Sequence, residues 1–136
     1  MAATSSRPLS PHLTIWRWGP HMLVSILHRA TGIALSVAGL AILTWWLSAI
    51  ANGPEAFATF LAFVHYKPFG VPIILVMLVG LTWSFFQHLL SGIRHLVMDT
   101  GAAFELGINK TFAVLTIVGS VLLTALLWAY LLGAIK

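Results

Sequence analysis

The sequence contains no cysteine and very little charge. Because none of its 136 residues is cysteine, disulfides, thiolate nucleophiles and cysteine-held iron–sulfur or zinc sites are excluded within this chain. Only 7% of the residues are charged, whereas about a quarter are charged in soluble domains. Hydrophobic residues make up 60%, a composition typical of proteins that lie in a bilayer. Any redox chemistry here would therefore need a bound cofactor.

The sequence also lacks a cluster of basic residues. Its seven lysines and arginines give a net charge of +4 but are scattered singly along the chain. Nucleic-acid binding needs a stripe or patch of positive charge that can follow phosphates. We therefore expect no nucleic-acid partner, and interpret these residues as anchors at the interface with membrane lipid.

Three long windows are free of charge, at 30–54, 68–93 and 111–135, and each holds 25 or 26 residues. A hydrocarbon core about 30 Å thick needs roughly 20 apolar helical residues. The windows lack the alternation of barrel strands. The sequence predicts an all-α membrane protein of one domain, 1–136, with an N-terminal segment at 1–21 and transmembrane helices at about 22–51, 69–97 and 111–134.

The basic residues predict the orientation. With three crossings, one side of the membrane receives five of them and the other side receives only Lys67 and Lys136; the five are Arg7, Arg17, Arg29, Arg94 and Lys110. Positive residues favour the inner side, so we expect the N-terminal segment there. The opening MAATSSRP has no apolar signal-peptide core, and without a transit peptide a bacterial cytoplasmic membrane is favoured over a mitochondrial inner membrane.

Two polar clusters fall inside the predicted membrane boundary. One occupies 25–32 at the start of the first span, and the other occupies 88–95 at the end of the second. Ionisable groups in spans usually face a bundle interior or a pocket. Both clusters belong to the same membrane face in this topology, so they can meet. The candidate site residues are Ser25, His28, Arg29, His88, Arg94 and His95.

His88 is the deepest of these groups. It precedes Arg94 by six residues, which places it about 9 Å further into the membrane. The residues alone leave three interpretations: a haem ligand, a buried histidine bonded to a neighbouring helix, or a proton relay. His95, about 10.5 Å along the same helix, is too distant to share one iron. A second axial ligand would therefore come from a partner chain.

The other polar residues also have structural interpretations. Arg29 and Arg94 at span ends are typical of orientation-setting anchors. Ser25 can bond to its own helix or pack against a neighbour. Gln87 can form a hydrogen bond between helices.

Three motifs together resemble one family. They are Arg7-Pro8-Leu9-Ser10-Pro11-His12-Leu13-Thr14-Ile15, Ser25-Ile26-Leu27-His28-Arg29-Ala30-Thr31-Gly32, and Gly92-Ile93-Arg94-His95-Leu96 through Asp99 and Gly101. Their order and spacing resemble the cytochrome b556 subunits of succinate dehydrogenase, the larger of the two small anchor chains of respiratory complex II. The resemblance covers nearly the whole chain.

The resemblance implies roles for individual residues. The histidine four residues before Gly-Ile-Arg-His, here His88, would be an axial ligand of haem b. Ser25 and Arg29 would form part of a quinone site. His28 would approach a haem propionate, and His95 and Arg94 would be further propionate or interface groups. Gln87 and Met98 depart from the tyrosine and tryptophan that relatives often have, which affects local packing and leaves the ligand assignment intact.

The resemblance also implies partners and an activity. Electrons from succinate would pass through a flavoprotein subunit and an iron–sulfur subunit to ubiquinone or another quinone, in equilibrium with haem b. A second small anchor subunit would supply the other haem ligand, and residues 7–18 would contact the iron–sulfur subunit. No catalytic residue is expected in this chain. Two alternatives stay open: the anchor of a related quinol:fumarate reductase, and a docking protein without a cofactor.

Overall fold

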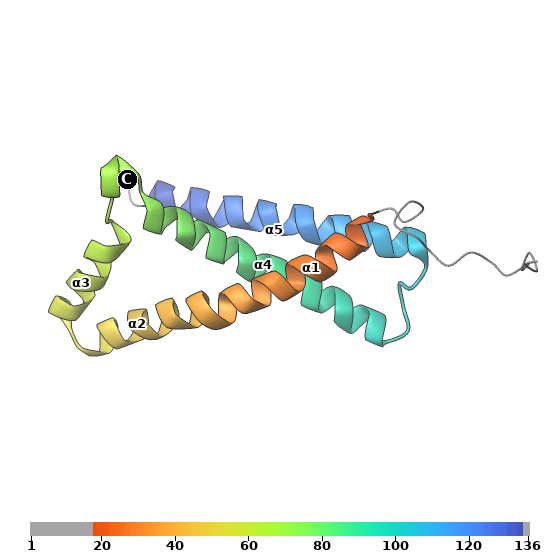
Figure 1. The fold of residues 1–136 in the computed structure, drawn as a ribbon, viewed down its shortest axis with the longest axis horizontal. Helices are drawn as coiled ribbons and strands as arrows, with labels where there is room; N and C mark the ends of the chain where they lie inside the picture. The colour runs from red at the N-terminus through yellow and green to blue at the C-terminus, as the bar shows by residue number, and fades with distance from the viewer. Residues whose placement is uncertain (1–17, 135–136) are drawn as a thin grey trace, which may run out of the picture.

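The structure, a computed structural model, describes residues 18–134 as helices joined by short connections, with no strand in that range (Figure 1). The helices are α1 (Pro20–Ala34), η1 (Leu35–Gly39), α2 (Leu40–Ala51), α3 (Pro54–Val64), η2 (Pro68–Gly70), α4 (Ile73–Asp99) and α5 (Leu106–Ala134). The N-terminal motif at 7–15, the basic residues Arg7 and Arg17, and Lys136 lie outside the described residues.

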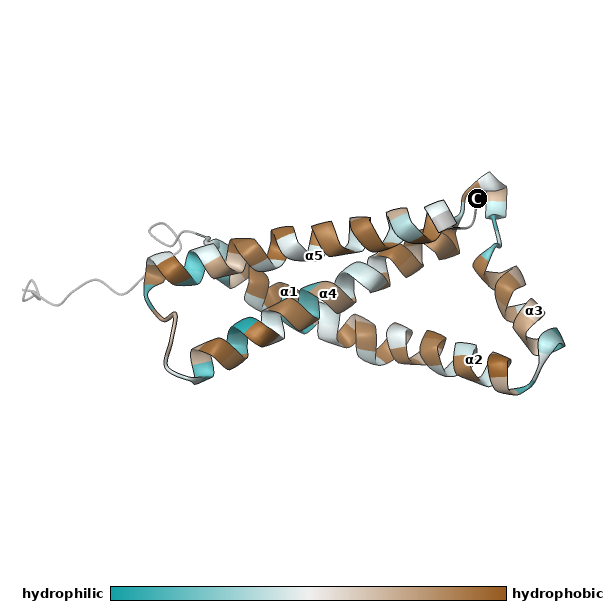
Figure 2. Ribbon diagram, turned by 180° about the vertical axis from the view of Figure 1, so that it is seen from behind, coloured by the Kyte–Doolittle hydropathy of each residue, from teal (hydrophilic) through white to brown (hydrophobic). Residues whose placement is uncertain are grey.

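Three helical segments are long and apolar enough to cross a membrane: Pro20–Ala51, Ile73–Asp99 and Leu106–Gly133. The shortest has 27 residues, so at 1.5 Å per residue each exceeds a hydrocarbon core about 30 Å thick. Hydrophobic residues dominate all three segments in Figure 2. The prediction of an all-α protein with three transmembrane helices is confirmed.

The first span is continuous but changes its helical geometry midway. It begins at Pro20, and proline suits a first helical turn because it lacks an N–H that would have no partner there. Between α1 and α2, the five residues of η1 form a π-helical turn. Such turns interrupt α-helices locally and are often found near functional sites. The span ends before Gly53, whose φ of 95° is a conformation that favours glycine.

The connection between the first and second spans is partly helical. It contains α3, an apolar helix of 11 residues. The second span then begins at Ile73 rather than about residue 69, because η2 makes a tight turn with positive φ at Phe69 and Gly70. The third span begins at Leu106, five residues before the predicted start at 111.

Helix α4 is central to the fold. It packs along α5 and crosses α1, whereas α2 diverges from α4 and α3 bridges the resulting gap (Figure 1). We call the end that holds Pro20, Asp99 and Leu106 the proximal end, and the end that holds α3 and η2 the distal end. The first span runs from proximal to distal, the second returns, and the third repeats the first direction.

The contact between α4 and α5 contains most of the buried polar groups. Gln87 is fully buried, and its Oε1 accepts a hydrogen bond of 2.8 Å from Ser120 Oγ. This confirms that Gln87 bonds across helices. Small and polar residues allow such close packing in membranes, and the others buried here are Ser84, Ser91, Arg94, Ala113, Thr116 and Thr124. Helix α5 thus covers one face of α4.

Candidate cofactor site

The two polar clusters meet where α1 crosses α4. The imidazole rings of His28 and His88 are stacked, with centroids 3.9 Å apart and planes 10° apart. The ring of His95 lies 5.0 Å from that of His28. The up-and-down order of the spans therefore brings three of the predicted site residues together.

The two ring nitrogens of His88 have different surroundings. Nδ1 lies 3.1 Å from the backbone oxygen of His28 and 3.3 Å from Thr31 Oγ1. Because a carbonyl oxygen can only accept, Nδ1 carries the proton and donates it to His28. Nε2 has no partner within residues 18–134 and is not among their buried unpaired atoms. A histidine held through Nδ1 with Nε2 free has the arrangement typical of metal ligands.

A glycine in α1 makes room for this ring. A Cβ atom at Gly32 would lie only 3.0 Å from His88 Cε1 and 3.5 Å from His88 Nδ1. At Gly92 in α4, a Cβ atom would lie 3.9 Å from His28 Cε1, an ordinary contact. A side chain at Gly92 would fit, whereas one at Gly32 would be too close to the His88 ring. The position of His88 therefore requires glycine at residue 32 but not at residue 92.

The other two histidines differ in what they contact. His95 Nδ1 bonds to its own helix, 2.7 Å from the oxygen of Ser91. The Nδ1 atom of His28 is buried and has no hydrogen-bond partner within residues 18–134. Buried polar atoms are nearly always paired in native proteins. The cluster therefore has an unmet hydrogen-bonding requirement beside the free nitrogen of His88.

Arg94 does not join the histidine cluster. Its side chain is 6% exposed and faces α5, where Nη2 donates to Asn109 Oδ1 at 2.5 Å. Arg94 and His95 are successive residues, and successive residues on a helix point about 100° apart. That rotation sends Arg94 to α5 and His95 to α1. Of the two roles expected of Arg94, propionate or interface group, this contact favours the interface role, and neither role is tested by it.

Ser25 and Arg29 lie one turn apart on α1, near the proximal end. Ser25 is half-buried and Arg29 is exposed. Within residues 18–134, neither side chain has a hydrogen-bond or ion-pair partner. Three cavities formed by the described residues are lined by others. A quinone pocket at these residues would therefore need walls from a neighbouring subunit.

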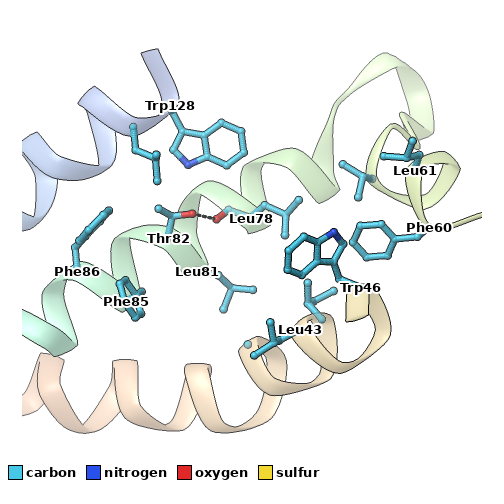
Figure 3. Close-up of a pocket in the computed structure, with 14 residues that line it drawn as sticks. Leu43, Trp46, Phe60, Leu61, Leu78, Leu81, Thr82, Phe85, Phe86 and Trp128 are labelled. Carbon is cyan, nitrogen blue, oxygen red and sulfur yellow. Dashed lines mark hydrogen bonds between the residues drawn. The ribbon is translucent and has the colours of Figure 1, made fainter. Parts of the chain in front are cut away.

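The largest of these cavities lies at the distal end, away from the histidines (Figure 3). It has a volume of about 520 Å³, and α2, α3, α4 and α5 contribute apolar and aromatic side chains to its walls. The hydroxyl of Thr82 donates to the oxygen of Leu78, and Trp128 Nε1 is buried without a partner within residues 18–134. No histidine lines this cavity, so it is not a candidate haem site.

Two contributors to the histidine cluster were not singled out from the sequence: Thr31, which is 3% exposed, and the backbone oxygen of His28. Thr31 follows His28 by three residues, and residues three apart share one helical face. That spacing could have identified Thr31. The sequence carries no signal for the role of a backbone oxygen.

The donors at this site suit a haem rather than a metal ion held by side chains alone. Within the described range, 18–134, no three histidine, aspartate or glutamate side chains gather as metal ligands would. Haem needs fewer protein ligands, because the porphyrin supplies four equatorial nitrogens and the protein supplies axial ones. One imidazole with a free Nε2 at the surface of the chain fits an axial ligand.

Three apolar spans with a histidine cluster at one end define a helical membrane subunit with a candidate axial ligand. The sequence matches the succinate dehydrogenase/fumarate reductase transmembrane subunit family over residues 3–127. The chain belongs to this family and is therefore part of an enzyme complex.

Relatives in the family cover most of the chain. The succinate dehydrogenase cytochrome b556 subunit of Paracoccus denitrificans is 40% identical over 121 residues, which are 89% of this chain and 88% of the relative. The protein of the same name from Rickettsia conorii is 40% identical over 126 residues, covering 91% and 92%. The mitochondrial cytochrome b560 subunit of Sus scrofa is 43% identical over 97 residues, covering 71% and 55%.

Proposed function

We propose that this succinate dehydrogenase anchor subunit supplies one axial ligand of haem b and part of the site where quinone is reduced. Family membership supports the anchor role. The observation that carries the haem assignment is the state of His88, whose Nδ1 is held by α1 and whose Nε2 is free. Bound haem b supplies reversible one-electron storage next to the quinone.

The residues of this chain hold and orient that ligand. The His28 oxygen accepts a hydrogen bond from Nδ1 of His88, which orients the ring and leaves Nε2 without a partner within residues 18–134. Gly32 lets the ring pack against α1. Because the described spans offer no second histidine suitably placed for the same iron, a second protein ligand would come from the second anchor subunit. The approach of His28 to a propionate stays a proposal, and the buried Nδ1 of His28 would not be the contacting atom unless the side chain turned.

The test of the haem role is a spectrum of the purified four-subunit complex. We expect His88→Leu to abolish the reduced-minus-oxidised b-type signal, because the axial nitrogen is lost. The control is His65→Leu, since His65 is exposed and its Nδ1 bonds only to its own helix, at the oxygen of Leu61. An unchanged b-type spectrum in His88→Leu would exclude this ligand. A wild-type complex without haem would favour the cofactor-free docking alternative.

The quinone proposal assigns separate tasks to Ser25 and Arg29. The Ser25 hydroxyl donates a hydrogen bond to one quinone carbonyl oxygen, and the guanidinium of Arg29 stabilises negative charge on the oxygen as electrons arrive. Their lack of partners within residues 18–134 supports this assignment. The iron–sulfur subunit delivers the electrons, and two protons complete the quinol.

This assignment is tested with two electron acceptors. In membranes, we expect Ser25→Ala to lower succinate–quinone reductase activity by up to about tenfold and Arg29→Gln by about ten- to a hundredfold. Succinate oxidation by a soluble dye that accepts electrons before the quinone site should be unchanged. Ser36→Ala and Lys110→Gln, at exposed positions, are the controls. Normal quinone reduction in both Ser25→Ala and Arg29→Gln would remove these residues from the pocket.

We further propose that the proximal end faces the cytoplasm of a bacterium, where the flavoprotein and iron–sulfur subunits bind. Because the chain has no cysteine, single cysteines can report the orientation. In intact spheroplasts, an impermeant maleimide should label Lys67→Cys and should label Lys110→Cys only after the membrane is opened. The reverse pattern would overturn the orientation.

A further inference from the structure

We propose that Thr31 is a positioning residue that, as a second acceptor beside the His28 oxygen, strengthens the hold on the Nδ1 proton of His88, so that the nitrogen offered to iron is Nε2. This inference deepens the proposed haem function and rests on it. Thr31 Oγ1 lies 2.7 Å from the oxygen of Leu27, 3.1 Å from the oxygen of His28 and 3.3 Å from His88 Nδ1. The hydroxyl is thus shared between its own helix and the ring on α4.

Counting protons determines the direction of each bond. A threonine hydroxyl has one hydrogen and two lone pairs. Its shortest contact is with the Leu27 oxygen, which can only accept, so the hydrogen is directed there. The side that faces His88 is then a lone pair, and Thr31 is an acceptor for Nδ1.

Both neighbours of Nδ1 are therefore acceptors. The opposite tautomer would place a bare Nδ1 lone pair 3.1 Å from the His28 oxygen and withdraw the Thr31 hydrogen from Leu27. Both changes are unfavourable. The proton is consequently held on Nδ1, and Nε2 retains the lone pair that a metal requires.

Burial makes this arrangement effective. Thr31 is 3% exposed, so water does not compete for its hydroxyl. Hydrogen bonds in a low-dielectric interior are stronger than those in water. An imidazole that donates through Nδ1 is a more basic ligand at Nε2, and basic ligands favour oxidised iron. Thr31 should therefore lower the midpoint potential of the haem.

The experiment compares threonine variants in the purified complex. Thr31→Val removes the hydroxyl at nearly constant volume, and we expect the reduction equilibrium of the haem to shift several-fold toward the reduced state. A tenfold shift would correspond to about 59 mV for one electron. Thr31→Ser keeps the hydroxyl that accepts from Nδ1, and its haem should have the wild-type potential. The potential of Thr31→Ala is measured in the same way. This variant removes the hydroxyl without adding the second methyl group that valine would place beside His88.

Thr124→Val is the matched control. Thr124 is also buried, at 7% exposed, and its hydroxyl makes the same bond of 2.7 Å to the oxygen four residues earlier, but its helix is α5 and no histidine is its partner. The potential should be measured by redox titration of haem absorbance, with the low-spin ferric electron paramagnetic resonance signal as a second readout. Equal potentials in Thr31→Val and Thr124→Val would overturn the proposal.

The outcome for His88 separates this inference from the haem assignment. If His88→Leu keeps its b-type spectrum, the ligand assignment fails and the role of Thr31 fails with it. If His88→Leu loses the spectrum while Thr31→Val and Thr31→Ala keep the wild-type potential, only the role of Thr31 is overturned.

Discussion

Helix α4 has two polar faces that differ in whether their unpaired atoms are buried or open to the surface. Toward α5, Gln87 and Arg94 are buried and bond to Ser120 and Asn109, and the atoms that stay unpaired within residues 18–134, Gln87 Nε2 and Arg94 Nε, are enclosed by the protein. Toward α1, His88 is half-buried and keeps one nitrogen free. Residues 87 and 88 are neighbours in sequence, yet one lies in a closed contact between helices and the other in a site open at the surface.

The difference shows how to separate packing from function in a membrane helix. Polar groups in a span are costly unless they are satisfied, and α5 satisfies many of those it covers. An unpaired atom that is accessible at the surface of an apolar span can be paired by a group from outside the chain, whereas one enclosed between helices cannot. On α4 the accessible atom belongs to His88, and the contrast between the faces predicts which substitutions change the cofactor and which change only stability.

The largest effect should follow from adding one carbon at the face toward α1. In Gly32→Ala, the new Cβ would lie 3.0 Å from His88 Cε1, so the ring must move away from its bond with α1. We expect haem retention to weaken about tenfold, as for the loss of other groups that orient a metal ligand. Haem per complex during dilution or competition with apomyoglobin measures this.

Gly92→Ala is the control for that substitution, because its Cβ would meet His28 at an ordinary 3.9 Å. Both changes replace a helical glycine with alanine, which favours the helix equally. Equal haem retention in the two variants would show that the close approach at Gly32 does not position His88.

An intermediate effect, on stability alone, is expected at Arg94. Arg94→Met keeps much of the side-chain stem but removes the bond to Asn109. A hydrogen bond to a charged group contributes about 1.5–3 kcal/mol, so the complex should be inactivated at a lower temperature. The haem spectrum should be unchanged, with exposed Lys110→Met as the control. A spectral shift would instead place Arg94 next to the haem.

The smallest effect should occur at Gln87. Gln87→Met removes the bond from Ser120, and hydrogen bonds between membrane helices average about 0.6 kcal/mol. The same substitution also removes the unpaired Nε2 of Gln87, which offsets part of the loss. We expect a change in thermal inactivation close to the limit of measurement and no change in haem content. Loss of haem in this variant would contradict the separation of the two faces.

Much of the fold follows from charge and length. The windows free of charge predicted three spans because a bilayer core imposes one length on every crossing. The sequence did not reveal α3, since its 11 residues are too few to cross and gave no reason to expect a helix in the connection. The start of α4 at Ile73 depends on the backbone turn at Phe69 and Gly70, which the apolar pattern does not encode.

The meeting of the three histidines was predictable from the sequence. Alternating span direction places His28 and His88 at one end, and the structure stacks their rings. The orientation of individual groups was less predictable. Whether Arg94 faces α5 or the histidines depends on the rotation of α4 about its axis, and the roles of Thr31 and the His28 oxygen depend on single hydrogen bonds.

The π-helical turn at η1 has a consequence for how the first span could diverge in sequence. A turn that accommodates one extra residue offsets everything beyond it by about 100° about the helix axis. The turn therefore sets how α1, with His28 and Thr31, is rotated about the helix axis relative to α2, with Trp46 at the distal cavity. An insertion or deletion within residues 35–39 would rotate the side chains of one half about the helix axis and leave those of the other half in place. The side-chain directions of the two halves can therefore change independently.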